Sequence, residues 1–248
     1  MPYFFAKERP DYSDLASGRV FHSLAGHPAF PIRLASEIFQ HCLALRQQDG
    51  FGERCALYDP CCGAGYLIST ICYLHWPEIK TAIGSDIDTH ASNLAGRNLH
   101  LLSEAGLSQR LAEISEMIRL YGKETHRDAL KSGLVLQEHV RRMAERYPLT
   151  TNAFQADALD GNALSAHLAD IPIDIVLTDV PYGLRSVWQG AHSGEPTWAL
   201  LDALRGVLAP GGLVAIAADK QQKIAHARYQ RIERFQVGKR RIAIFKPI

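Results

Sequence analysis

Apolar residues along this chain gather into short runs, and the stretches between the runs show the three- and four-residue spacing of helices. Each run is five to seven residues long, the length of a buried strand. The runs are CALYD (55–59), TAIGSD (81–86), NAFQAD (152–157), IDIVLTD (173–179) and LVAIAAD (213–219). Strands that alternate with helices predict an α/β fold with a Rossmann-like, doubly wound parallel sheet.

The end of the chain has a different pattern. Residues 229–237 alternate between polar and apolar side chains, Gly238-Lys239 supplies a turn, and residues 240–246 alternate again. This pattern is typical of a β-hairpin. With the hairpin added, we predict a seven-stranded, mostly parallel sheet that ends in an antiparallel pair.

Two segments extend this core within what we expect to be one domain, residues 1–248. Residues 1–50 form a lead-in, in which Pro31 opens a helical pattern. About sixty-five residues separate the second and third runs, far more than one crossover needs. Residues 103–147 within that gap show helical spacing with breaks near Tyr121-Gly122 and Ser132-Gly133. They predict two or three extra helices beside the sheet, either as a structural cover or as a substrate-gripping module.

Composition fits a soluble globular protein. Hydrophobic residues make up 47% of the 248 positions and charged residues 21%. No run of eighteen apolar residues and no signal peptide is visible, so we expect a cytoplasmic protein without membrane contact. The five cysteines lack the spacing of a zinc site, which indicates reduced thiols and no metal. The oligomeric state stays open, with a monomer favoured.

Charge is distributed unevenly. The chain as a whole carries a formal charge of +1, but residues 219–248 hold nine Lys or Arg against two acids, a net charge of +7. The hairpin is therefore basic, and it is a candidate surface for nucleic acid. A solvated charged face is the plainer alternative.

The first run leads into a glycine loop with the sequence DPCCGAGYL, residues 59–67. Gly63 and Gly65 allow a sharp turn before a helix, a common way to bring a ligand to a helix N-terminus. A dinucleotide fingerprint would need a third Gly or Ala at position 68, where this chain has Ile68. A nicotinamide oxidoreductase is thus disfavoured, although it stays open.

The second and third apolar runs each end in an acidic residue. Asp86 stands at the end of the second run, 23 residues after Gly63, where a carboxylate can accept the two hydroxyls of a ribose. Asp88 is expected to cap the next helix. Asp157 closes the third run and is placed to receive an adenine amino group.

These features together resemble the class I S-adenosylmethionine-dependent methyltransferases. That resemblance covers the chain from about residue 55 to its end, apart from the insertion, and it implies S-adenosylmethionine as the cofactor. The residues it assigns to cofactor binding are Asp59, Cys61, Gly63, Gly65, Asp86, Ile87, Asp157 and Ala158.

The fourth run ends in TDVPYG, residues 178–183. Methyltransferases that modify nitrogens of nucleobases carry [DN]-P-P-[YFW] at this place, so the resemblance assigns catalysis to Asp179, Pro181 and Tyr182. Asp179 offers an acceptor for an N–H group of a flipped base, and Tyr182 offers a stacking surface. Val180 replaces the first proline of the motif and allows a different loop shape.

The whole chain further resembles the 23S rRNA methyltransferases that confer resistance to orthosomycin antibiotics. The stretches that carry this match are SLAGHPAFP (23–31), DPCCGAGYL, GSDID and TDVPYG. This resemblance implies methylation of guanine N1 in 23S rRNA near the peptidyl transferase centre, on free RNA or on the large ribosomal subunit.

RNA binding is predicted for the basic hairpin and for the polar loop after TDVPYG, which is placed to close over a flipped base. The residues are Lys220, Lys239, Arg240 and Arg241 in the first region and Arg185 and Trp188 in the second. Arg19, His22 and Arg33 of the lead-in are weaker candidates.

Several alternative functions stay open. The residues alone also fit methylation of guanine N2 or adenine N6 in another RNA or DNA. A non-catalytic RNA-binding protein on the same fold is less consistent, because the cofactor acids are intact. A methyltransferase acting on protein glutamine or on a small molecule is disfavoured by the basic hairpin.

Overall fold

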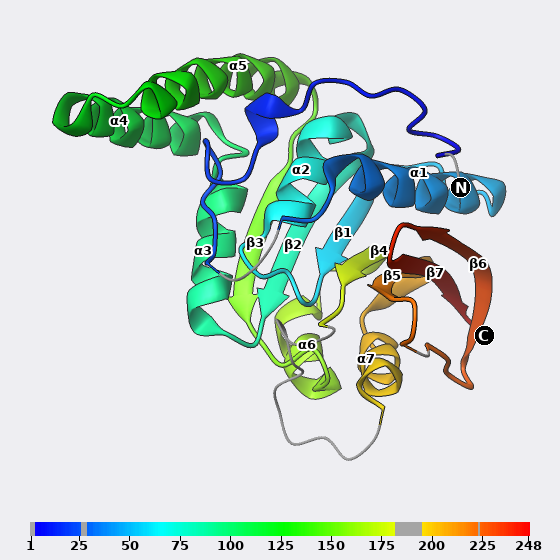
Figure 1. Ribbon diagram of the computed structural model, residues 1–248. Coiled ribbons are helices and arrows are strands. Elements are labelled where there is room, and N and C mark those ends of the chain that lie inside the picture. The colour runs from blue at the N-terminus through cyan, green and yellow to red at the C-terminus, as the bar shows by residue number, and fades with distance from the viewer. Residues whose placement is uncertain (1–2, 26–28, 182–194, 223) are drawn as a thin grey trace.

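The computed structural model describes residues 3–25, 29–181, 195–222 and 224–248, and a seven-stranded sheet forms its centre (Figure 1). The strand order is β3-β2-β1-β4-β5-β7-β6. The first five strands pair in parallel, and β7 and β6 are antiparallel. The predicted sheet and its terminal hairpin are confirmed. The strands are β1 (Cys55–Asp59), β2 (Ile79–Asp86), β3 (Thr150–Gln155), β4 (Ile173–Asp179), β5 (Leu208–Asp219), β6 (Tyr229–Val237) and β7 (Arg240–Pro247).

Helices cover both faces of the sheet (Figure 1). Alternate strand residues face opposite sides, so each strand contributes to two cores. Leu57 and Ile175 pack in the core that includes α1 and α2, whereas Tyr58 and Val176 pack in the core that includes α6 and α7. The helices are α1 (Ile32–Gln48), α2 (Tyr66–Leu74), α3 (Thr89–His100), α4 (Glu104–Tyr121), α5 (Glu124–Arg146), α6 (Gly161–Leu168) and α7 (Pro196–Leu204), with short 3-10 turns at Ser13–Leu15 and Trp76–Glu78.

The insertion consists of α4 and α5, a helical hairpin that extends away from the sheet (Figure 1). Two helices fall within the predicted number, and the predicted break at Gly122 is confirmed by its left-handed backbone, with φ of 61°. The predicted break at Ser132-Gly133 is wrong. A Cβ at Gly133 would lie 2.6 Å from Leu111 Cδ2 of α4, so this glycine lets the two helices approach closely and does not end a helix.

Three strands of the sheet have boundaries that differ from the predicted runs, and β2 begins at Ile79, two residues before its predicted start. β3 begins and ends two residues earlier than expected, so Asp157 lies in the loop beyond the strand. The register explains this end point, because Gln155 pairs with Asp86, the last residue of β2, and no partner strand continues. β5 begins at Leu208, five residues before the predicted start.

No helix in the described part of the chain is both long and apolar enough to cross a membrane. All five cysteines are free, and four of them are buried. The described residues contain no group of three metal-ligating side chains.

Candidate functional site

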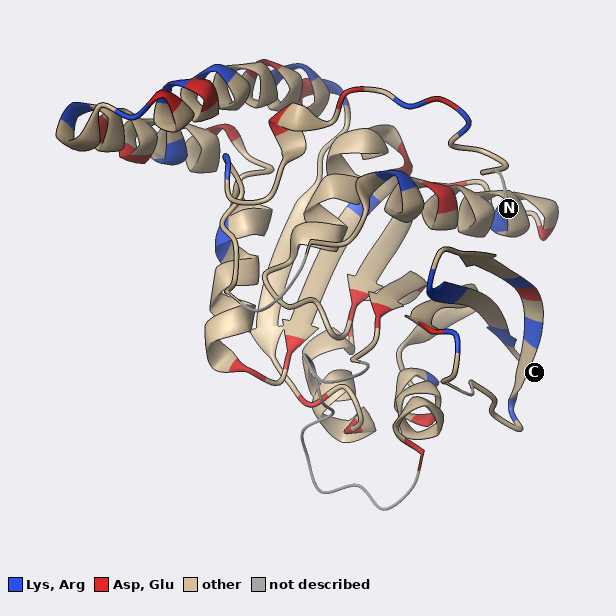
Figure 2. Ribbon diagram, viewed as in Figure 1, with Lys and Arg blue, Asp and Glu red and all other residues tan. Residues whose placement is uncertain are grey.

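Acidic side chains gather where the parallel strands end. β1 lies between β2 and β4, so Asp59 at its end is flanked by Asp86 and Asp179 at the ends of the neighbouring strands. Figure 2 shows acidic residues together at these strand ends, along one edge of the sheet. In open α/β sheets this edge is where ligands bind. The predicted cluster of acids is therefore present.

The glycine loop is held against the end of β2. The Cys62 N–H donates to the Ser85 carbonyl oxygen at 2.9 Å, and the Gly63 N–H donates to Asp86 Oδ2 at 2.9 Å. Gly65 is the N-cap of α2, with φ of 71°, and a Cβ there would lie 2.9 Å from Ala95 Cβ of α3. Gly65 is thus required by its backbone conformation and by helix packing, reasons that involve this chain alone.

Asp86 is fixed by two backbone donors. Oδ2 accepts the Gly63 N–H, and Oδ1 accepts the Asp88 N–H at 3.0 Å. An ionised carboxylate has about four lone-pair sites, so each oxygen keeps one for a ligand. Ile87, the adjacent predicted residue, is half-buried. Asp88 caps α3 as predicted, accepting the His90 N–H at 2.7 Å.

Asp59 is the most deeply buried acid of the cluster. Its side chain is 1% exposed, and its Oδ1 accepts the N–H of the half-buried Cys61 at 3.2 Å. Burial, with a further contribution from the charges of Asp86 and Asp179, raises the pKa of Asp59 to about 7. None of the described lysine and arginine side chains pairs with it.

Asp157 lies beside Asp86 although it is not in a strand. The Ala156 N–H donates to the backbone oxygen of Asp86 at 3.1 Å, which brings the two loops together. Asp157 Oδ1 accepts the Leu159 N–H at 2.9 Å, and the side chain is half-buried. Ala158 is buried next to it. The loop after β3 therefore extends the acidic edge past β2.

Asp179 ends β4 in a different environment. Its carboxylate Oδ1 lies 3.6 Å from Arg240 Nε, and the side chains of the two residues are 25% and 22% exposed. Burial raises the pKa of Asp179 to about 6, and the Arg240 charge opposes that rise. A half-buried carboxylate of this kind is ionised at neutral pH and can still accept a proton.

The structure explains why TDVPYG has valine where the related motif has proline. Val180 is buried, and its N–H donates to the Ala217 carbonyl oxygen at 3.0 Å, which extends the pairing of β4 with β5 by one residue. A proline has no N–H and would lose this bond. Pro181 is half-buried after it, and Tyr182 lies outside the described residues.

The predicted RNA-binding residues fall into four groups. Lys220 and Lys239 are exposed, and the Lys220 N–H donates to the Lys239 carbonyl oxygen at 3.2 Å, so the loop after β5 lies against the hairpin turn. Arg241 is half-buried, with Nη1 3.5 Å from the Gln222 carbonyl oxygen. Arg240 belongs to the Asp179 environment. Arg185 and Trp188 lie outside the described residues.

Two of the weaker lead-in candidates hold the chain together. Arg33 donates to the carbonyl oxygens of Ala6 and Lys7 at 2.8 and 2.9 Å. Arg19 donates to Ser132 Oγ at 3.3 Å. Arg33 therefore stabilises the lead-in itself, and Arg19 joins the lead-in to α5 of the insertion.

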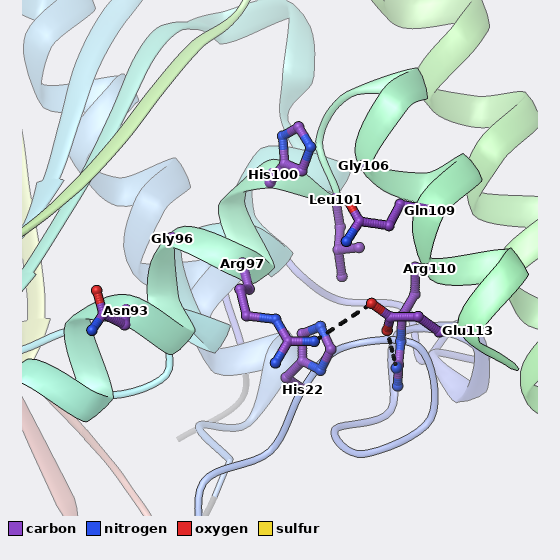
Figure 3. A pocket seen from close by; sticks show the side chains of 10 residues that line it. All are labelled: His22, Asn93, Gly96, Arg97, His100, Leu101, Gly106, Gln109, Arg110 and Glu113. Atoms are coloured by element: carbon purple, nitrogen blue, oxygen red, sulfur yellow. Dashed lines mark hydrogen bonds and ion pairs between the residues drawn. The ribbon is translucent and has the colours of Figure 1, made fainter. Parts of the chain in front are cut away.

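A separate pocket of about 290 Å³ lies along α3 and α4. Figure 3 shows that its lining residues His22, Arg97, Arg110 and Glu113 lie close together. Glu113 pairs with Arg110 at 2.8 Å and with Arg97 at 3.7 Å. His22 lies beside them, and burial together with the two arginine charges lowers its pKa to about 4. None of the strand-end acids lines this pocket.

Asn98 is a residue whose importance sequence patterns did not reveal. It is fully buried in α3, and its Nδ2 donates to the backbone oxygens of His22 and Ala64 at 2.9 and 2.8 Å. Its Oδ1 accepts the His22 N–H at 2.7 Å. The lead-in is thereby tied to the glycine loop. An asparagine within a helix carries no signal of such long-range contacts.

Comparison with known proteins gives consistent matches over nearly the whole chain. The family model described as rRNA methyltransferase AviRa matches residues 1–240. A protein of Streptomyces viridochromogenes named 23S rRNA (guanine(2535)-N(1))-methyltransferase is 42% identical over 238 residues, which cover 96% of this chain and 93% of the relative. A solved structure of the rRNA methyltransferase AviRa from the same organism has a TM-score of 0.86 at 39% identity, covering 98% of this chain and 96% of that one. A second structure of AviRa has a TM-score of 0.85.

Proposed function

Because the chain belongs to the AviRa family of rRNA methyltransferases, we propose that it transfers a methyl group from S-adenosylmethionine to N1 of a guanine in 23S rRNA. The expected target region is near the peptidyl transferase centre, where methylation would confer resistance to orthosomycin antibiotics. The observation that carries the proposal is the position of two acids on either side of Asp59. Asp86 is suited to bind the ribose of the cofactor, and Asp179 is suited to contact the target nucleobase.

The residues present fit the cofactor. S-adenosylmethionine supplies an already activated methyl group on a sulfonium centre. Asp86 would accept the ribose hydroxyls through its two remaining lone-pair sites. Asp157, in the adjacent loop, would accept the adenine amino group. Asp59 would pair with the cationic amino group, which fits a buried acid that none of the described cations neutralises.

The N-terminus of α2 completes this set. Gly65 caps the helix without a side-chain hydrogen bond, so the first backbone N–H groups of α2 are available to the carboxylate of the cofactor. Asp59 would therefore face the cationic amino group of the ligand, and the N-terminus of α2 would face its carboxylate.

Asp179 is the residue that would contact the target guanine. Guanine N1 carries a proton at neutral pH and must lose it when the nitrogen attacks. The Asp179 carboxylate would accept this proton or hold the N–H in line, and its raised pKa improves it as a base. The Pro181 carbonyl oxygen offers a second acceptor, and Tyr182 is the aromatic residue available to stack on a base extruded from the RNA.

Lys220 and Lys239 are exposed, and we expect them to contact the RNA backbone. The double substitution K220A/K239A removes one charge from the loop after β5 and one from the hairpin turn, two segments whose backbones share a hydrogen bond. RNA affinity should fall, and the magnitude of the slope of log affinity against log salt should decrease by about 1.4 to 1.8, because each phosphate contact contributes about 0.7 to 0.9. Filter binding across a salt series measures both quantities. An unchanged salt slope would show that RNA does not contact this surface.

Cofactor affinity should depend on pH through Asp59. This acid holds its proton up to about pH 7 in the free protein, and a cationic ligand favours the ionised form. Affinity should therefore rise as pH increases from about 5.5 to 7, by up to about tenfold per unit, and then level off. Calorimetry with S-adenosylmethionine gives the profile.

The D59N variant is the control for that titration. It should bind the cofactor more weakly and with little pH dependence over the same range. It should also melt at a higher temperature at neutral pH, because the folded-state pKa lies above the unfolded value and ionised Asp59 therefore destabilises the fold. A D59N protein that keeps the wild-type pH profile would remove Asp59 from the cofactor site.

The proposed activity is tested by transfer of labelled methyl groups to intact ribosomes, isolated large subunits and naked rRNA. Incorporation into 23S rRNA in at least one of these substrates supports the proposal. Absence of label from all three RNA substrates, with cofactor binding intact, would refute it.

A further inference from the structure

We infer that Arg240 is a positioning residue, which holds Asp179 charged and correctly oriented for the target base and is itself held by Phe30. This inference rests on the proposed function of Asp179. It gives Arg240 a role different from the phosphate contact that the basic sequence of the hairpin suggests.

The sheet places Arg240 beside the end of β4. β5 lies between β4 and β7, with Asp179 paired to Ala217 and Asp219 paired to Arg240. The Arg240 side chain reaches across β5, so that its Nε lies 3.6 Å from Asp179 Oδ1. Two continuous strand pairings therefore fix the separation of the two backbones, and only the side chains are left to adjust.

Phe30 holds the other face of the guanidinium. The Arg240 Cζ lies 5.0 Å from the centre of the Phe30 ring, within the range of a cation–π interaction. Phe30 is 5% exposed and lies two residues before the start of α1, so its ring is part of the core and not a mobile surface group. The lead-in and the hairpin, the two ends of the chain, thus meet at the catalytic acid.

The contact engages one carboxylate oxygen. Asp179 Oδ1 is buried and makes no hydrogen bond within the described part of the chain, and the Arg240 cation is the group that faces it. This arrangement leaves Oδ2 for the base. Arg240 is 22% exposed, whereas Lys239, one position earlier, is exposed and better placed for a contact with an RNA backbone.

Arg240 opposes the effect of burial on Asp179. Asp59 and Asp86 end β1 and β2, and Asp219 ends β5 with its Oδ1 bound to the Gln221 N–H, so the other titratable groups at these strand ends are acids. Burial favours the protonated form of Asp179, whereas Arg240 favours the ionised form. Without Arg240, the pKa of Asp179 should rise, and a smaller fraction of the acid should be ionised at neutral pH.

The test compares R240M with R234M, which removes an exposed arginine from the neighbouring strand β6. In R240M the acidic limb of the rate–pH profile should move up by about one unit. The rate near pH 6.5 should then fall about threefold, approach a tenfold loss below about pH 5.5 and recover largely near pH 9, with kcat affected and KM for the cofactor within about threefold. R234M should keep the wild-type profile.

A second measurement does not depend on activity. Carbon-13 NMR of labelled aspartate carboxyl groups, with the Asp179 signal assigned from D179N, should show a higher pKa for Asp179 in RNA-free R240M than in wild type. This measurement separates the two claims, because absence of methyl transfer by the wild type refutes the proposed function while the titration still decides the role of Arg240.

R240K provides a second test in case R240M does not fold. It retains the charge at a shorter reach and should shift the Asp179 titration by less than R240M, in the same direction. The inference is overturned if R240M and R240K leave both the pH profile and the Asp179 titration unchanged and alter only RNA affinity and its salt dependence, because that result identifies a phosphate contact.

Discussion

Replacing Asp179 with alanine should lower the rate of methyl transfer to RNA by at least about a hundredfold, while cofactor affinity stays within about threefold of the wild-type value. The expected loss has two causes: the acceptor for the guanine N1 proton disappears, and the base is no longer aligned with the methyl group. D179N keeps the shape of the side chain and should lose nearly as much activity, because an amide does not accept the proton. Single-turnover transfer of labelled methyl groups measures the rate directly.

D160N is the matched control for these variants. Asp160 caps α6 by accepting the N–H groups of Asn162 and Ala163, and asparagine is an equally good cap. D160N should therefore show wild-type turnover. Near-normal turnover in D179A, with RNA and cofactor bound as usual, would show that another group performs the proton transfer and orients the base.

Replacing Asp86 with alanine should weaken S-adenosylmethionine binding by about a hundredfold or more. Two charge-assisted hydrogen bonds to the ribose hydroxyls would be lost, each worth about 1.5 to 3 kcal/mol. The substitution also removes the acceptor of the Gly63 N–H, so the glycine loop loses its attachment to β2. Isothermal titration calorimetry of the purified protein gives the change in the dissociation constant.

D88A separates loss of the ligand contact from loss of local structure. Asp88 lies two residues from Asp86 and accepts the His90 N–H as the cap of α3. Its removal should lower the free energy of unfolding by about 1 kcal/mol and leave the cofactor dissociation constant nearly unchanged. Equal loss of affinity in D86A and D88A would mean that Asp86 acts through the loop and not through the ribose.

The sheet could be predicted from the sequence because its strands are short, apolar and separated by helical patterns. The boundaries of β1 and β4 match the predicted runs. The sequence pattern places β3 two residues too late, because the end of this strand is set by the end of its partner β2, which is a tertiary property. The same pattern predicts a helix break at Gly133, although this glycine makes room for Leu111 of the facing helix. Sequence spacing alone does not distinguish these two uses of glycine.

The acids of the site were found for a similar reason, since each follows a strand and parallel strands end at one edge. Arg240 shows where this reasoning stops. Its sequence context is a basic hairpin, and only the pairing of β5 with β7 reveals that its side chain points to Asp179. The role of Val180 likewise depends on a hydrogen bond to Ala217, a residue 37 positions away in the chain.

Methylation at guanine N1 can be identified from the chemical nature of the modified nucleoside. Large subunits from a strain without the enzyme are incubated with the protein and S-adenosylmethionine, and the 23S rRNA is digested and examined by mass spectrometry against nucleoside standards. We expect N1-methylguanosine at one site, with a stop of reverse transcriptase at the same guanine, because N1 lies on the edge that pairs with the complementary base. Label found instead as N2-methylguanosine or N6-methyladenosine, with no N1-methylguanosine and no such stop, would contradict this expectation.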